Sequence, residues 1–334
     1  MTLLKHITVI CCTLIAAGFG SGCGSGDDST VHTDTSPKVI EEDGLYGYIN
    51  NSGTVIIKPQ FYQAGDFSEG LCPVNIRGKF GYIDETGTVV IEPQFDRARK
   101  FSSGYAIVNI GGKWGYIDKS GALTVEPKFD LAWNFTDGPA RVMVSGVFGY
   151  IDTAGDYVIE PAFSDAGKFS ESLATIKVDD KYGYIDITGT VVIEPQFDFA
   201  WMFTDGMASV KVGDTFGFID TTGKIVIEPQ FEMAWNYSEG YAVIKQNGLY
   251  GFINKKGDIV IEAQFDYSSG FYEGRAAVKT DSLFGYINSS GKMVIKPRFE
   301  DAKTFSGGIA LVQVDGEWAY IDRKGRFVYG GDEK

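Results

Sequence analysis

Acidic side chains that recur along the chain are the first candidates for chemistry. Two sets of carboxylates repeat every 34 residues: Asp84, Asp118, Asp152, Asp186 and Asp220, and Glu92, Glu126, Glu160, Glu194, Glu228 and Glu262. Clustered carboxylates can transfer protons or bind metal ions. However, Asn50, Asn254 and Asn288 occupy the first position in other copies, and Lys58 and Lys296 occupy the second. Because Asp and Asn both bond to a turn's backbone, we interpret the first set as turn residues and the second as solvated charges.

Other residues on which catalysis commonly depends are scarce. The two histidines, His6 and His32, both precede the repeats, so histidine-based proton transfer, catalytic triads and histidine metal sites are excluded there. The cysteines are Cys11, Cys12, Cys23 and Cys72. Cys72 stands where the other copies have alanine, which predicts a small buried side chain rather than a nucleophile. We therefore expect no enzyme activity, no cofactor and no metal site.

The N-terminal residues carry the pattern of an export signal. Lys5 precedes an apolar run at 7–19, and small residues lead to Cys23, so we interpret residues 1–22 as a signal peptide. Gly20-Ser21-Gly22-Cys23 resembles the lipobox of bacterial lipoproteins. The resemblance implies that Cys23 is lipidated and anchors the protein to a bacterial membrane, facing outside the cytoplasm; the alternative is secretion. Residues 23–37, rich in Gly, Ser, Asp and Thr, read as a flexible tether.

One motif recurs every 34 residues through the rest of the chain. Its glycine appears at Gly47, Gly81, Gly115, Gly149, Gly183, Gly217, Gly251 and Gly285, and Ala319 takes its place in a last copy. Helical repeats can have this length, but β-branched triplets, several glycines and usually a proline in each copy disfavour helices. We therefore predict an all-β domain of nine units over residues 38–330, with a tail at 331–334.

Each unit contains three predicted strands, as at residues 106–110, 113–118 and 123–125. Short turns join them, so they form a three-stranded antiparallel meander. Pro127 ends the third strand or places it at an edge. A linker follows, in which Phe129 and Phe135 are expected to fix the chain to the core.

These motifs resemble the bacterial WG-repeat family, named for a Trp-Gly pair such as Trp114-Gly115. The resemblance covers residues 38–330, and it implies a β-repeat scaffold that binds other molecules and no established reaction. Repeat units of this kind stack on their neighbours. Because no unit is split between the two ends of the chain, we favour an open or loosely closed superhelical array. The alternative is a toroid like a β-propeller.

The linker offers candidate binding residues because one of its positions varies between copies. That position reads Gly65, Arg99, Trp133, Gly167, Trp201, Trp235, Ser269 and Lys303. Leu131, Phe199, Met202 and Met233 lie beside the tryptophans, at places where other copies have polar residues. Clustered apolar residues on a surface indicate a binding site; packing between units is the other interpretation.

The sequence thus favours a non-catalytic scaffold of the cell envelope. Its predicted partner is a protein segment or a glycan, bound through a rim made of Trp133, Trp201, Trp235, Leu131, Phe199, Met202 and Met233. The formal net charge of −14 disfavours nucleic acid, and the membrane would be contacted only through the N-terminal lipid. The alternative function is a structural spacer or envelope-organising protein without a single ligand.

Overall fold

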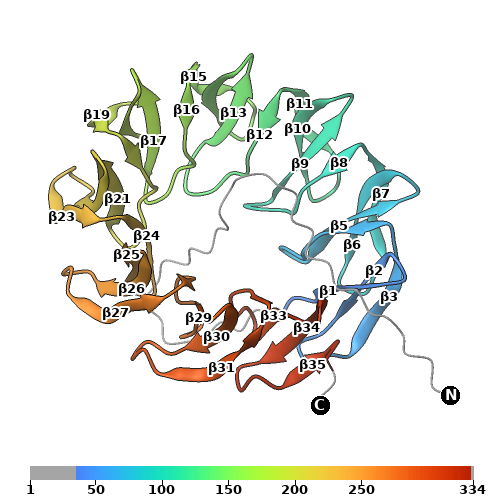
Figure 1. Cartoon of the computed structure of the whole chain (residues 1–334). Helices are drawn as coiled ribbons and strands as arrows, with labels where there is room; N and C mark the ends of the chain where they lie inside the picture. Colours follow the sequence, from blue (N-terminus) through green and yellow to red (C-terminus); the bar gives the residue numbers. More distant parts are fainter. Residues whose placement is uncertain (1–34, 332–334) are drawn as a thin grey trace.

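The described residues form a ring of small antiparallel sheets. The computed structural model describes residues 35–331, which fold into nine sheets arranged like blades around a centre (Figure 1). We number the blades 1 to 9 in chain order. Blade 1 has three strands, and each of the other eight has four. The fold is a nine-bladed β-propeller.

Every complete blade repeats the same four strands in the same order. Blade 1 consists of β1 (Lys38–Glu42), β2 (Leu45–Ile49) and β3 (Val55–Phe61). The innermost strands of blades 2 to 9 are β4 (Gln63–Ala64), β8 (Arg97–Ala98), β12 (Leu131–Ala132), β16 (Asp165–Ala166), β20 (Phe199–Ala200), β24 (Met233–Ser238), β28 (Tyr267–Ser268) and β32 (Asp301–Ala302). The second strands are β5 (Leu71–Ile76), β9 (Tyr105–Ile110), β13 (Ala140–Val144), β17 (Leu173–Val178), β21 (Met207–Val212), β25 (Tyr241–Gln246), β29 (Ala276–Thr280) and β33 (Ile309–Val314).

In blades 2 to 9 the third strand contains the position of the recurring glycine, and the fourth strand lies at the outside of the ring (Figure 1). The third strands are β6 (Lys79–Asp84), β10 (Lys113–Asp118), β14 (Val147–Ile151), β18 (Lys181–Asp186), β22 (Thr215–Asp220), β26 (Leu249–Asn254), β30 (Leu283–Ile287) and β34 (Glu317–Asp322). The outermost strands are β7 (Val89–Phe95), β11 (Leu123–Phe129), β15 (Tyr157–Phe163), β19 (Val191–Phe197), β23 (Ile225–Phe231), β27 (Ile259–Phe265), β31 (Met293–Phe299) and β35 (Phe327–Tyr329).

The predicted open or loosely closed superhelix is wrong, because blade 9 closes onto blade 1. Asn51 Nδ2 donates to the Gly307 carbonyl at 2.9 Å, and the Tyr320 hydroxyl donates to the Val39 carbonyl at 3.1 Å. Ile40 and Ile309 share one buried cluster across this seam. We had expected a closed ring to divide one blade between the two ends of the chain. Side-chain packing and hydrogen bonds close this ring without a shared strand.

The seam repeats a contact made elsewhere in the ring. Lys119 Nζ donates to the carbonyl of Glu69 at 3.3 Å, fifty residues earlier, in the preceding blade. If the repeat numbering is continued from blade 9 into blade 1, Asn51 stands fifty positions after Gly307, the same separation as between Lys119 and Glu69. The seam therefore has the geometry of an ordinary interface between blades, which is why the sequence needed no split unit to form a ring.

The linkers also differ from the predicted meander, because they supply a fourth strand. In blade 4, Leu131 pairs with Met143 and Ala132 pairs with Val142. Phe129, Ala132 and Phe135 are buried, which confirms that the two phenylalanines fix the linker to the core. The outer strand continues through the proline instead of ending there. For example, β11 continues past Pro127 to Phe129. Proline is tolerated because this strand is the outer edge of its sheet.

Buried tyrosines and phenylalanines connect neighbouring parts of the ring. The Tyr184 hydroxyl donates to the Trp201 carbonyl in the next linker at 2.7 Å, and its ring lies 4.8 Å from that of Phe203. Most blades repeat this contact, for example between Tyr116 and the carbonyl of Trp133. Turns of neighbouring blades are joined as well, since the Glu171 carboxylate accepts a hydrogen bond from the Gly206 amide of the following blade. Each interface thus combines apolar burial with satisfied polar groups.

Cys72 is buried, as predicted from the alanines of the other copies. Its Sγ lies 2.7 Å from the Tyr48 hydroxyl, and burial raises the pKa of the thiol to about 12. We expect iodoacetamide to alkylate Cys72 at about pH 8 at least ~100-fold more slowly in the folded protein than in denaturant, since the thiolate is the reactive form. Mass spectrometry of the Cys72 peptide measures both rates, and similar rates would contradict this prediction.

Candidate functional site

The repeated aspartates form turns, as predicted. Asp84 Oδ1 accepts the backbone amides of Thr86 and Thr88 at 2.9 and 3.0 Å. Asn50 makes the same pair of bonds in blade 1. The hydrogen bond from the Thr86 hydroxyl is the main cause of the lowered pKa of Asp84. The glutamates before the prolines are exposed. Within residues 35–331, no group of three or more His, Cys, Asp or Glu side chains could hold a metal ion.

The innermost strands and the residues that follow them position the predicted binding residues. Ala132 and its equivalents point into the core, so side-chain alternation turns Leu131 and Trp133 to the other face of the strand. Leu131, Trp133, Phe199, Trp201, Met202, Met233 and Trp235 are all half-buried. They belong to blades 4, 6 and 7, where they lie on or directly after the innermost strands β12, β20 and β24 (Figure 1).

Blade 5 interrupts the predicted rim, because it carries Asp165 and Gly167 at these positions. The structure therefore leaves Leu131 and Trp133 apart from the others. In blade 4, the Arg141 guanidinium lies 3.9 Å from the centre of the Trp133 ring and donates to the Ala166 carbonyl of blade 5. Trp133 thus packs at an interface between blades.

The remaining residues form two groups, one in blade 6 and one across blades 7 and 8. The Phe199 and Trp201 rings lie 5.1 Å apart, and the Trp235 ring lies 5.9 Å from that of Tyr250. Tyr267 of blade 8 continues the series, at 5.8 Å from Trp235. The binding residues predicted from the sequence did not include Tyr267. It occupies the same repeat position as Leu131, Phe199 and Met233, and its aromatic type is the signal that could have found it.

Lysines accompany these rings. Lys211 lies 6.0 Å above Phe216, Lys245 lies 5.3 Å above Tyr250, and Lys279 lies 5.3 Å above Phe284. A cation over the face of an aromatic ring is attracted to the ring electrostatically. We define the inner aromatic strip as the following residues of blades 6 to 8: Phe199, Trp201, Met202, Lys211, Met233, Trp235, Lys245, Tyr267 and Lys279. It joins half-buried apolar surface with positive charge in an otherwise acidic protein.

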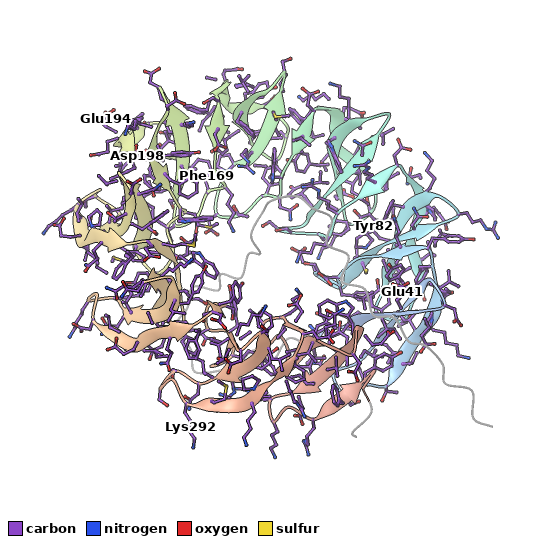
Figure 2. The ribbon with its side chains drawn as sticks, viewed as in Figure 1. Glu41, Tyr82, Phe169, Glu194, Asp198 and Lys292 are labelled. Atoms are coloured by element: carbon purple, nitrogen blue, oxygen red, sulfur yellow. The ribbon has the colours of Figure 1, made fainter. Side chains whose placement is uncertain are left out.

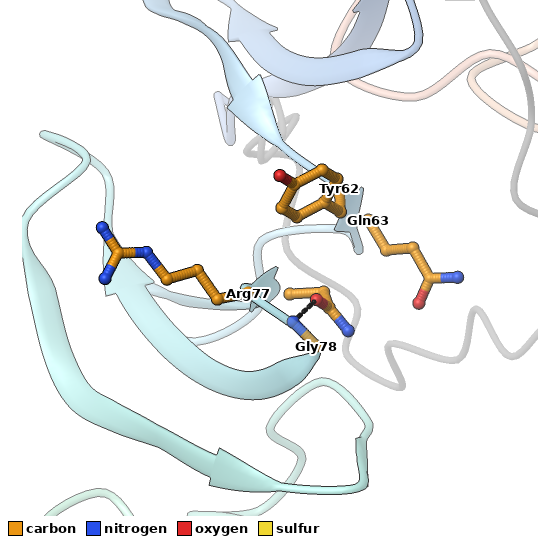
Figure 3. A pocket seen from close by; sticks show the side chains of 5 residues that line it. Tyr62, Gln63, Arg77 and Gly78 are labelled. Atoms are coloured by element: carbon orange, nitrogen blue, oxygen red, sulfur yellow. Dashed lines mark hydrogen bonds between the residues drawn. The ribbon is translucent and has the colours of Figure 1, made fainter.

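A shallow hollow of about 440 Å³ lies in blade 2, away from this strip (Figure 3). Tyr62, Gln63, Asn75, Arg77 and Gly78 line it. Asn75 Oδ1 accepts the Gly78 amide at 2.9 Å. Four other blades have a lysine at the position of Asn75.

Comparison with known sequences identifies the repeat. The model of the WG containing repeat matches eight successive segments, at residues 46–80, 80–114, 114–147, 148–182, 182–215, 216–250, 250–283 and 284–318. The chain belongs to the WG-repeat family. The copy between residues 318 and 331 lies beyond the matched segments, and there the WG-repeat motif carries Ala319 and a shortened outer strand.

Comparison with solved structures shows one whose overall fold is similar to that of this WG-repeat protein. The crystal structure of a eukaryotic initiation factor is 12% identical, with a TM-score of 0.63, over 90% of this chain and 96% of the other. The dihydro-heme d1 dehydrogenase NirN in complex with DHE is 13% identical, with a TM-score of 0.46, over 89% of this chain and 72% of the other. At such identity the first similarity shows the fold alone. No curated protein sequence matches the chain.

The predictions of a signal peptide, a lipid on Cys23 and a flexible tether bear on localisation. The predicted signal peptide, Cys23 and most of the tether lie outside the described residues. Among residues 35–331, no helix is long and apolar enough to cross a membrane.

Proposed function

We propose that this WG-repeat protein is a non-catalytic binding scaffold of the bacterial cell envelope. In this proposal a lipid on Cys23 holds it at a membrane, facing outside the cytoplasm. The inner aromatic strip binds a protein segment or a glycan. The observation that carries the proposal is the grouping of Phe199, Trp201, Trp235 and Tyr267 on three successive blades, at repeat positions that are polar or glycine in blades 2, 3 and 5.

The chemistry of the strip suggests what its ligand carries. Aromatic faces stack on planar groups and on the apolar faces of sugar rings, and aromatic anchors dominate the binding energy of many interfaces. Lys211, Lys245 and Lys279 attract negative charge. An acidic peptide or an acidic glycan combines both features.

The closed ring weighs against the alternative of a spacer. An open array grows longer with each unit, whereas an added blade in a ring increases mainly its diameter. The rigid ring instead holds side chains from several blades at fixed separations, which reduces the entropy cost of binding.

Replacing Trp201 and Trp235 together by alanine tests the strip. We expect a fall in affinity of at least about tenfold for its ligand, as for aromatic hot spots, with a small change in melting temperature. Binding is measured on acidic peptide and acidic glycan arrays, which also separates the two ligand classes, and then by titration with the best binder.

Trp133→Ala is the matched control, because Trp133 occupies the same repeat position in blade 4 but packs against Arg141. We expect it to keep full affinity. A double variant that binds as tightly as the unaltered protein would contradict the proposal. So would a large fall in melting temperature in the double variant, since that would assign Trp201 and Trp235 to packing.

A further inference from the structure

Three other blades hold a carboxylate at the place of the hollow in blade 2. In each, an aspartate before the inner strand accepts a hydrogen bond from the first amide of the turn between the second and third strands. The pairs are Asp96 and Gly111 at 2.8 Å, Asp130 and Ser145 at 2.6 Å, and Asp198 and Gly213 at 2.7 Å (Asp198 is labelled in Figure 2). A lysine of the preceding blade joins each carboxylate, as Lys113 joins Asp130 at 2.6 Å. Blades 3, 4 and 6 therefore contain a site that is filled by their own carboxylate.

Blade 2 keeps the backbone of this site but lacks its carboxylate. Tyr62 occupies the repeat position of Asp96. The Tyr62 amide donates to the Asn75 carbonyl at 3.2 Å, just as the Asp96 amide donates to the Asn109 carbonyl at 2.9 Å. The Tyr62 side chain is 62% exposed. The lysine of the preceding blade is also missing, because Leu45 stands at its position.

The turn of blade 2 carries a positive charge beside the missing acid. Arg77 stands at the turn position that is acidic or neutral in all other blades, where it reads Asp43, Gly111, Ser145, Asp179, Gly213, Asn247, Asp281 and Asp315. Its φ of 54° is a left-handed conformation that favours Gly, Asn or Asp over arginine. Among the residues that the structure describes, neither the Arg77 amide nor its guanidinium has a hydrogen-bond or ion-pair partner. Both groups are therefore available to an anion.

The remaining groups of the hollow suit a sugar. Asn75 Oδ1 accepts the Gly78 amide at 2.9 Å, which leaves the Asn75 Nδ2 group to donate to a ligand. The side-chain amide of Gln63 adds donors and an acceptor. The exposed Tyr62 ring offers an apolar face and a hydroxyl beside them (Figure 3). The volume of about 440 Å³ lies in the range of small-molecule sites.

We propose that this hollow binds an acidic sugar of the uronic acid class, whose carboxylate takes the place of the missing aspartate. The carboxylate accepts the Arg77 amide, as the aspartates of blades 3, 4 and 6 accept the equivalent amides, and it pairs with the Arg77 guanidinium. The sugar ring lies against Tyr62, and its hydroxyls bond to the amides of Gln63 and Asn75. The site shares no residue with the inner aromatic strip and does not depend on it.

Two sugars that differ in one group test the proposal. Methyl glucuronide carries a carboxylate where methyl glucoside carries a hydroxymethyl group. We expect methyl glucuronide to bind the full-length protein at least about tenfold more tightly in NMR titrations, in the range of hydrogen bonds to a charged group. Acetyl-dialanine, which carries its carboxylate on a peptide, should bind at least about tenfold more weakly than methyl glucuronide. Equal binding by the two sugars, or tighter binding by the peptide, would overturn the proposal.

Two variants place the sugar in the hollow. Arg77→Gln should weaken the binding of methyl glucuronide at least about tenfold, whereas Arg97→Gln, the same change at an exposed arginine of blade 3, should not alter it. Tyr62→Asp restores the residue that blades 3, 4 and 6 carry, so it should fold, fill the site with its own carboxylate and weaken binding at least about tenfold. Tyr62→Phe keeps the ring and should keep most of the affinity. Unchanged binding by Arg77→Gln or by Tyr62→Asp would overturn the proposal.

Aspartates of the chain itself are the other candidate occupants. Asp27, Asp28 and Asp34 precede β1. If replacing all three by asparagine tightens the binding of methyl glucuronide about tenfold or more, a carboxylate of the chain is the occupant and the proposal fails. The double alanine variant of Trp201 and Trp235 should bind methyl glucuronide as the unaltered protein does, and a tenfold loss there would assign the sugar to the strip instead.

Discussion

Gly183→Ala is expected to destabilise the ring by about 3 kcal/mol or more, as severe overpacking does. A β-carbon at Gly183 would lie 2.4 Å from the carbonyl oxygen of Ile193 and 2.6 Å from the nitrogen of Pro195. Both are backbone atoms of the outer strand, which bulges towards the glycine, so no side-chain rotation can relieve the contact. Urea unfolding followed by tryptophan fluorescence measures the loss.

Blade 9 supplies the matched control, because Ala319 occupies the same repeat position. There β35 ends at Tyr329, Gly330 lies against Ala319, and Gly331 stands at the repeat position of the proline. We expect Ala319→Gly to stay within about 1 kcal/mol of the unaltered protein, since it only adds backbone freedom. Similar losses in the two variants would show that close backbone approach is not the reason for the glycine.

The buried tyrosines predict a steep loss of stability in alkali. Burial is the main cause of the raised pKa of Tyr82, Tyr116, Tyr150, Tyr184 and Tyr286. In the unfolded chain these groups lose protons above their ordinary pKa of 10.0, while in the folded protein they keep them. The unfolded state then binds fewer protons, so the free energy of unfolding falls as pH rises. Each tyrosine contributes about 1.4 kcal/mol per pH unit, or about 7 kcal/mol for five at about pH 11.

Denaturant titrations at about pH 9 and pH 11 measure this loss. Tyr184→Phe should reduce the difference by about 1.4 kcal/mol, one tyrosine's share. Blade 6 already has Phe218 at this repeat position, so the ring tolerates the shape. Tyr184→Phe should lower the tyrosinate absorbance of the unfolded protein at about pH 10 but leave that of the folded protein unchanged. A decrease in the folded protein would contradict the prediction.

The unit of the fold could be predicted from the sequence because each of its parts rests on local chemistry. Asp and Asn at one position implied a turn, and Asp84 and Asn50 make the same bonds. The linker phenylalanines were expected to fix the chain to the core, and Phe129 and Phe135 are buried. Such features depend on residues a few positions apart, so a single copy contains the information.

Ring closure could not be predicted in this way. It depends on the small rotation between neighbouring blades, which no residue type specifies by itself. Asn51 and Gly307 meet only because nine such rotations complete a circle. The tryptophans show the same limit. Sequence variation identified the three tryptophans, but only the structure shows that Trp133 packs against Arg141 and that Trp235 lies beside Tyr267.

The outer strands have a consequence for how two rings meet at high protein concentration. Most begin with two β-branched or large apolar residues, such as Val191 and Val192, that are exposed at the circumference. Such edges invite pairing between molecules, but Pro195 cannot donate a backbone hydrogen bond and Glu194 adds a charge beside it. Ala263 replaces the proline in β27 alone among the seven-residue outer strands of residues 35–331. Proline therefore disfavours edge-to-edge pairing of nearly all the seven-residue outer strands, and β27 of blade 7 is the one that lacks this protection among the described residues.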